Sequence, residues 1–191
     1  MGKKQPIIQI STKTGDQGTT GLADGRRLPK TAPVFQVLGK IDQLSSYLGL
    51  VVALMNEKKE VWQKEADFLL SVQKDLFVIS GQLAGASQSR LSPQSLSFLE
   101  KKGWQWQKEL AKENNWQNNF LFPGGSVLAA HLDIARTLCR QTELSIWQYR
   151  QENSQLPLLL ARYLNRLSDV LYLLRSRVNH AVDFKEKKLK L

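Results

Sequence analysis

The sequence predicts an all-α fold, a bundle of five long helices that follows a polar N-terminal arm. Apolar residues recur at the three- and four-residue spacing of amphipathic helices over most of the 191 residues. Residues that favour helix starts, together with Gly and Pro, divide this pattern into five long segments with short connections. Long helices joined by short loops pack as antiparallel neighbours, so a helix bundle is the expected architecture.

The five helices are expected at residues 33–56, 61–84, 92–114, 126–150 and 157–182, after a short β-leaning segment at 7–10. The polar run Asn56–Lys59 separates the first two helices. Ser92 and Pro93 supply a cap and a first-turn proline for the third helix, and Ser126 caps the fourth after two glycines. Pro157 opens the last helix in its first turn, where a missing N–H costs nothing.

The length suits a single domain over residues 1–191, with an arm at 1–32, the helix bundle at 33–182 and a basic tail at 183–191. Apolar residues make up 42% and charged residues 23%, as in globular proteins. No apolar run reaches the roughly 18 residues of a membrane span, and the N-terminus has no secretory pattern. We therefore expect a cytoplasmic protein with no membrane partner. Cys139, the only cysteine, is expected to pack in the core, and no zinc-type cluster is available.

The net charge of +10 raises the alternative of a basic nucleic-acid-binding bundle. Part of this excess lies in terminal lysines, which usually belong to solvated tails. These are Lys3, Lys4, Lys185, Lys187, Lys188 and Lys190. No DNA-binding helix signature or aromatic RNA platform accompanies them, so we predict no nucleic-acid partner. A phosphate-rich small molecule explains the internal positive charge at least as well.

Residues 12–20, Thr-Lys-Thr-Gly-Asp-Gln-Gly-Thr-Thr, contain no apolar side chain and cannot contribute to a core. Gly15 and Gly18 let backbone N–H groups turn together toward an anion, the threonines offer hydroxyls, and Lys13 adds positive charge. The segment is not a Walker A loop, because that motif is missing from the sequence. It indicates a polyphosphate cradle; the alternative is a polar arm whose glycines only serve turns.

The first, fourth and fifth helices each have a narrow polar stripe opposite an apolar face. The stripe residues are Gly39, Asp42, Ser46 and Gly49, then Asp133, Arg136, Arg140 and Glu143, then Arg162, Asn165, Asp169 and Ser176. The faces expected to be buried are Val37, Ile41, Leu44, Leu48, Val51 and Met55, then Val127, Ile134, Ala135 and Leu138, then Leu160, Leu164, Leu167, Leu171, Leu174 and Val178. Arginine predominates over lysine on the stripes, and guanidinium groups suit bidentate contacts to carboxylates or phosphates. The stripes indicate a ligand or partner surface, or else a solvated face with local ion pairs.

Five sequence motifs follow one another along the chain. They are Thr-Lys-Thr-Gly-Asp-Gln-Gly-Thr-Thr-Gly-Leu (12–22), Leu-Gly-Lys-Ile-Asp-Gln-Leu-Ser-Ser (38–46), Phe-Leu-Phe-Pro-Gly-Gly-Ser (120–126), Ala-Arg-Thr-Leu-Cys-Arg-Gln-Thr-Glu (135–143) and Tyr-Leu-Asn-Arg-Leu-Ser-Asp (163–169). Through these motifs, from about residue 8 to about residue 178, the chain resembles the PduO-type ATP:cob(I)alamin adenosyltransferases. One motif alone would be weak, but five in this order are highly specific.

The resemblance implies a function and an assembly. The protein would move the 5′-deoxyadenosyl group of ATP to the cobalt of cob(I)alamin and release triphosphate, with Mg²⁺ bound alongside ATP. The bundle would be ferritin-like with a left-handed up-down arrangement. Three copies would form a homotrimer that binds ATP and reduced corrinoid where neighbouring subunits meet. A cob(II)alamin reductase or a cobalamin-dependent enzyme is the further partner that the resemblance implies.

The resemblance also assigns residues. The nucleotide loop would consist of Thr12, Lys13, Thr14, Gly15, Asp16, Gly18 and Thr19. Lys30 matches a further phosphate-side lysine, and Asp42 and Arg136 match an ion pair across the subunit boundary. The residues that match ATP-contacting or site-organising positions are Arg140, Glu143 and Asn165. Phe120 matches the aromatic residue beneath the corrin ring; its alternative role is to fill the end of the bundle. No residue is implied as a metal ligand.

In this reaction class the reduced cobalt of the substrate is the nucleophile, so the protein supplies alignment and charge rather than a catalytic base. Lys13, Lys30, Arg140 and Mg²⁺ would stabilise the departing triphosphate. The sequence departs from the family pattern at Ser11, Gln43, Asp133 and Gln141. The charges that are lost at Gln43 and Gln141 leave open an alternative, an ATP- or corrinoid-binding carrier or sensor with weakened turnover.

Overall fold

The computed structural model describes residues 11–112 and 120–189. Within these ranges the chain forms five helices, as predicted. They are α1 (Pro33–Asn56), α2 (Lys59–Leu83), α3 (Pro93–Leu110), α4 (Val127–Glu152) and α5 (Leu158–Ala181). Four short strands accompany them, β1 (Thr19–Gly21), β2 (Arg27–Pro29), β3 (Phe120–Leu121) and β4 (Lys188–Leu189). The extended segment expected at 7–10 lies outside the described residues, and α3 ends before the predicted residue 114.

Two predicted helix caps are confirmed. The Ser92 hydroxyl accepts a hydrogen bond from the Gln94 N–H (3.2 Å), and the Ser126 hydroxyl accepts one from the Ala129 N–H (3.3 Å). Each satisfies a backbone donor that the first helical turn leaves without a partner. Pro93 lies in the first turn of α3, and Pro157 precedes α5.

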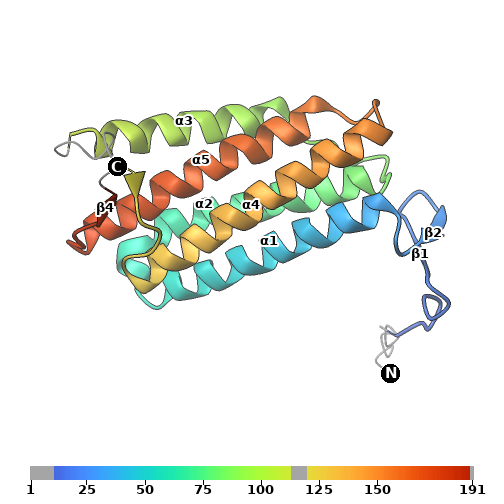
Figure 1. Cartoon of the computed structure of the whole chain (residues 1–191), viewed down its shortest axis with the longest axis horizontal. Helices are drawn as coiled ribbons and strands as arrows, with labels where there is room; N and C mark the ends of the chain where they lie inside the picture. The colour runs from blue at the N-terminus through green and yellow to red at the C-terminus, as the bar shows by residue number, and fades with distance from the viewer. Residues whose placement is uncertain (1–10, 113–119, 190–191) are drawn as a thin grey trace, which may run out of the picture.

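The helices pack as a bundle in which α4 contacts α5 and α1, α1 also contacts α2, and α3 packs on α5. Figure 1 shows successive helices running in alternating directions along one long axis. The predicted apolar faces of α1 and α5 are buried throughout, from Val37 to Met55 and from Leu160 to Val178. Cys139 is buried in this core, and its S–H donates to the Leu164 carbonyl (3.2 Å).

Of the helices in the described ranges, α1 alone is long and apolar enough to cross a membrane by composition. Its apolar side chains form part of the bundle core, where Ile41, Leu44 and Leu48 are almost completely buried. Packing against α2 and α4 therefore accounts for the buried apolar face of this helix.

The stripe prediction is partly wrong on α4 and α5. Val127 and Ile134, expected in the core, are 70% and 45% exposed, whereas Asp133 and Ser176, expected on the polar face, are buried. Asp133 is buried because Arg175, itself buried on α5, donates to its carboxylate (3.1 Å). A buried ion pair of this kind cannot be read from the helical period of one segment.

The two strand pairs lie at opposite ends of the bundle (Figure 1). β1 and β2 form an antiparallel hairpin beside the start of α1, and β3 pairs antiparallel with β4 beyond the end of α5. The basic tail thus differs from the expected solvated run. The side chains of Lys185 and Lys187 are exposed, but the tail backbone is bound to the segment that precedes α4.

Candidate functional site

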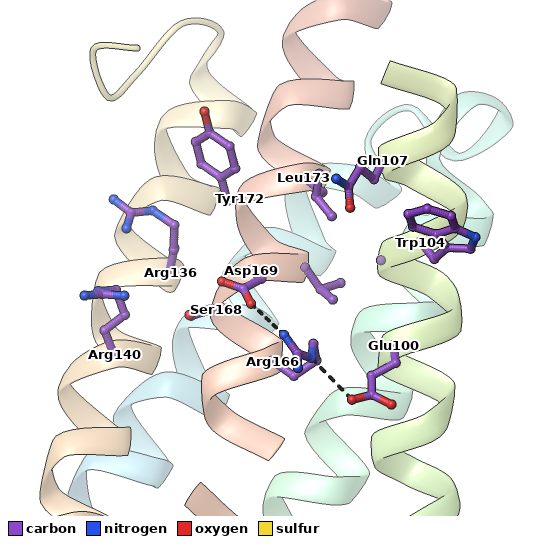
Figure 2. Close-up of a pocket in the computed structure, with 12 residues that line it drawn as sticks. Glu100, Trp104, Gln107, Arg136, Arg140, Arg166, Ser168, Asp169, Tyr172 and Leu173 are labelled. Carbon is purple, nitrogen blue, oxygen red and sulfur yellow. Dashed lines mark hydrogen bonds and ion pairs between the residues drawn. The ribbon is translucent and has the colours of Figure 1, made fainter. Parts of the chain in front are cut away.

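A groove with a cavity of about 530 Å³ runs between α3, α4 and α5. Figure 2 shows Arg136 and Arg140 on one side of it, both from α4, and Glu100 and Trp104 of α3 on the opposite side. α5 lies between them and contributes the floor, including Ser168 and Leu173. The groove therefore combines an arginine edge with an aromatic and apolar wall.

A second hollow of about 370 Å³ continues the groove, since Glu100 and Arg166 line both cavities. The side-chain N–H of Asn165 donates to Glu143 Oε1 (3.3 Å), and the indole N–H of Trp147 donates to the same oxygen (3.4 Å). Glu143 is therefore held in place from both α4 and α5. The structure thus brings four of the predicted site residues, Arg136, Arg140, Glu143 and Asn165, to one surface.

The arginines of the groove differ in how far they are already paired. Arg166 bonds Asp169 (3.1 Å) and lies 3.5 Å from Glu100. Arg140 is exposed and has no hydrogen bond or ion pair with any described residue. Arg136 Nε lies 3.5 Å from Asp133 Oδ1 but makes no hydrogen bond within the described ranges. Arg136 and Arg140 are accordingly cations with donors available for a ligand or a partner.

Sequence reasoning missed the α3 residues that line this groove, among them Glu100, Trp104 and Gln107. None of the five motifs falls on α3, so no local signal marked them. Arg166 lay inside a motif, next to Asn165, but nothing in its spacing distinguished it from a surface arginine.

The predicted nucleotide loop is an ordered turn next to the hairpin. Gly18 adopts φ 78°, a left-handed conformation that suits glycine, and its carbonyl accepts from the Lys30 N–H (2.8 Å). The Lys30 ammonium lies against Gly15, where an added Cβ would be 3.3 Å from Nζ. The hydroxyls of Thr12 and Thr14 are 3.0 Å apart. The structure therefore places Lys30 against the loop, and its role beside a phosphate stays a prediction.

Arg27 was not singled out in the sequence, yet it organises this loop. Its guanidinium donates to the Thr14 carbonyl (2.7 Å) and to the Thr19 hydroxyl (3.1 Å). Lys13 adopts φ 56°, a conformation uncommon for a residue with a side chain. Loop, hairpin and Lys30 together form an exposed concentration of N–H groups, hydroxyls and positive charge.

Ten predicted site residues are not brought into the groove of the same chain by any described contact, namely the seven residues of the loop together with Lys30, Asp42 and Phe120. Lys30 and its loop lie at the end of the bundle where α1 begins, and Phe120 lies in β3 at the other end (Figure 1). α4 alone has 26 residues, which at about 1.5 Å each is about 39 Å. Asp42 is exposed on α1, and neither Arg136 nor any other described residue pairs with it.

The site contains no reactive thiol and no metal cluster in the described part of the chain. Burial raises the pKa of the Cys139 thiol, which keeps it protonated. No three His, Cys, Asp or Glu side chains gather there to hold an ion. His131 is engaged by Tyr47, whose hydroxyl lies 2.7 Å from Nδ1.

Comparison with known proteins gives a consistent result. The family described as cobalamin adenosyltransferase matches residues 10–178. The chain is 34% identical over 188 residues to the corrinoid adenosyltransferase of Mycobacterium leprae, covering 93% of this chain and 94% of that protein. It is 33% identical to the cobalamin adenosyltransferase of Cupriavidus metallidurans, covering 92% and 90%.

A solved structure adds the fold. A variant of the PduO-type ATP:corrinoid adenosyltransferase from Lactobacillus reuteri, complexed with cobalamin and ATP, superposes with a TM-score of 0.85 at 26% identity. The match covers 96% of this chain and all of that one.

Proposed function

Because the chain belongs to the cobalamin adenosyltransferase family, we propose that it transfers the 5′-deoxyadenosyl group of ATP to the cobalt of cob(I)alamin. The bond between C5′ and the triphosphate oxygen breaks, a cobalt–carbon bond forms with electrons from the reduced cobalt, and triphosphate leaves. The observation that carries this proposal is the groove in which Arg140 has no described partner beside the fixed Glu143–Asn165 pair.

No proton is transferred in this reaction, so the protein needs no general base. Its task is to align C5′ with the cobalt and to stabilise the charge that builds on triphosphate, effects worth roughly 7–11 kcal/mol for alignment in favourable cases. Lys13 and Lys30 at the loop and Arg140 in the groove are exposed cations suited to that charge. Phe120 would supply an apolar surface beneath the corrin ring.

Magnesium fits the loop. Mg²⁺ prefers hard oxygen ligands and usually reaches a protein with the phosphates of its nucleotide. The exposed Thr12 and Thr14 hydroxyls, 3.0 Å apart, and the exposed Asp16 carboxylate are such donors. Bound there, Mg²⁺ would neutralise part of the triphosphate charge.

We propose that the active unit is a homotrimer in which each site combines two chains. The loop and β3 of one chain lie at opposite ends of its bundle, too far apart to act on one ATP and one corrin ring. The outer face of α4 also exposes apolar side chains at Val127, Ile134 and Leu144, which suits a subunit contact. Asp42 of one chain would then reach the open donors of Arg136 in its neighbour.

The transfer is tested by incubating the protein with ATP, Mg²⁺ and chemically reduced cobalamin. Conversion to the photolabile adenosyl form supports the proposal. A spectrum that stays stable to light would mean binding alone, as expected of a carrier or sensor.

We place the reaction in the cytoplasm, with a cob(II)alamin reductase as electron donor, and we treat residues 1–191 as one domain.

The shared site is tested by mixing two inactive variants, Lys30→Ala in the loop and Arg140→Ala in the groove. Random hybrid trimers would join an intact loop to an intact groove at about one quarter of their interfaces and recover activity in proportion. Each variant alone should stay inactive. No recovery from verified hybrids would show that loop and groove act within one chain, and would overturn the two-chain site without affecting the proposed reaction.

A further inference from the structure

The end of the bundle that carries β3 contains a buried charge cluster outside the groove. Arg175 of α5 has a side chain only 2% exposed, and its Nε donates to Asp133 Oδ2 (3.1 Å). Another of its nitrogens pairs with Glu186 in the C-terminal tail. Its remaining donors reach the carbonyls of Phe122 (2.7 Å) and Gly124 (3.2 Å). One guanidinium therefore binds α4, the tail and the segment after β3 at once.

Asp133 connects this cluster to the groove. Its Oδ2 accepts from Arg175 and from the Gly124 N–H (2.7 Å), while its Oδ1 faces Arg136 Nε at 3.5 Å. Arg136, which lines the groove, thus forms an ion pair with a carboxylate that also holds the segment 122–124. The four charges of Asp133, Arg136, Arg175 and Glu186 sum to zero, so the cluster can be buried without a net charge.

The tail completes the arrangement from the other side. The Phe122 N–H donates to the Lys187 carbonyl (3.1 Å), next to the β3–β4 pair. The buried Asn179 amide donates to Glu186 Oε1 (2.9 Å) and to the Gly124 carbonyl (3.0 Å), and it accepts from the Ser126 N–H (3.0 Å). Segment 120–126 is therefore fixed by the tail as well as by the bundle.

We propose that Asp133, Arg175, Asn179 and Glu186 form a tail clamp that positions segment 120–126 and Arg136 for the corrinoid. The C-terminal tail is then a working part of the corrinoid site, although it lies beyond every motif in the sequence. This inference rests on the proposed function, because it assigns the clamp to the corrinoid half of that reaction. The nucleotide loop, at the other end of its own bundle, has no described contact with the clamp.

Two variants test the clamp. Glu186→Gln removes one charge and keeps the shape of the side chain, and a chain ending at residue 182 removes the tail altogether. In both we expect faster amide hydrogen exchange in segment 120–126, an unchanged KM for ATP, a raised KM for cobalamin, and turnover lowered by about 10–100-fold. Asp67→Asn, a charge removal on the exposed face of α2, is the matched control and should match wild type in all four.

The readouts separate the possible failures. Equal loss of affinity for ATP and cobalamin would indicate general destabilisation and overturn the positioning role. Wild-type exchange and wild-type KM for cobalamin in Glu186→Gln and in the shortened chain would overturn the clamp itself. Should the shortened chain not fold, Glu186→Gln decides. If the wild-type protein shows no adenosyl transfer, the proposed reaction fails. Amide hydrogen exchange in segment 120–126, together with the affinity for cobalamin, would then still decide whether the tail holds the segment.

Discussion

Adjacent glycines before α4 provide a direct test of the tail clamp in energetic terms. Gly124 and Gly125 have φ of 114° and 116°, where any side chain is strained, so alanine at either position should cost about 1–3 kcal/mol. The two differ in what a new Cβ would meet. At Gly124 there is open space, whereas at Gly125 the Cβ would come under 3.0 Å from the amide of Asn179.

Asn179 cannot move away cheaply, because it is completely buried and makes hydrogen bonds to Ser126, Gly124 and Glu186. At a net value of about 1 kcal/mol for each hydrogen bond, displacing its amide should cost about 3 kcal/mol beyond the backbone strain. We therefore expect Gly125→Ala to lower the free energy of unfolding by about 3 kcal/mol more than Gly124→Ala.

Urea unfolding at one fixed protein concentration measures this difference, since association makes stability concentration-dependent. The midpoint should fall further for Gly125→Ala with no change in the slope of free energy against urea. Equal losses in the two variants would show that Asn179 yields freely, and would refute the reasoning that its hydrogen bonds fix this segment.

Two further predictions concern the groove and the core. Arg140→Ala should reduce turnover by about 100-fold or more, whereas the control Lys64→Ala, on the exposed face of α2, should leave turnover unchanged. Wild-type rates in Arg140→Ala would show that Arg140 does not stabilise the departing triphosphate. Burial raises the pKa of Cys139, so the unfolded chain, whose thiol titrates near about 8.5, loses its proton first as the pH rises. The contribution of Cys139 to the free energy of unfolding should therefore be constant below the pKa of the unfolded thiol. Above that pKa it should fall by up to about 1.4 kcal/mol per pH unit. Cys139→Ala should flatten this slope between about pH 8.5 and 10, and an unchanged slope would contradict it.

The helices that were predicted most accurately are those whose burial follows one period. On α1 and α5, leucine, isoleucine and valine recur at three- and four-residue spacing, and every residue expected in the core is buried. Asp42 and Asn165 are exposed, each on the side of its helix opposite the buried face, as predicted. The reason is that a single apolar stripe fixes the rotation of a helix about its axis. Position on a face is therefore predictable from one segment.

Contacts between segments were not predictable in this way. Gly39 and Gly49 were both predicted on the polar stripe of α1, but their surroundings differ. An added Cβ at Gly39 meets open space, whereas one at Gly49 would lie 3.4 Å from Gln73 of α2. Gln73 in turn donates to the Ser45 carbonyl (2.9 Å), so Gly49 serves packing inside the bundle. Sequence spacing identified the small residue but not the neighbour that it accommodates.

The wrong predictions concentrate at the end of the bundle that holds the tail clamp, and those for Asp133 and for the tail have one physical cause. A buried carboxylate such as Asp133 is tolerable only where a cation balances it, and its partner Arg175 lies 42 residues away on another helix. The tail adds a second carboxylate to this pair, Glu186, and Arg136 beside Asp133 supplies the positive charge that balances it. A local helical pattern scores each of these residues as a surface charge and the tail as solvent-exposed. The same balance explains why this end can be both core and functional surface. One carboxylate oxygen of Asp133 accepts hydrogen bonds from Gly124 and Arg175, and the other faces Arg136. Arg136 makes no hydrogen bond within the described ranges, so its donors are available to a ligand in the groove.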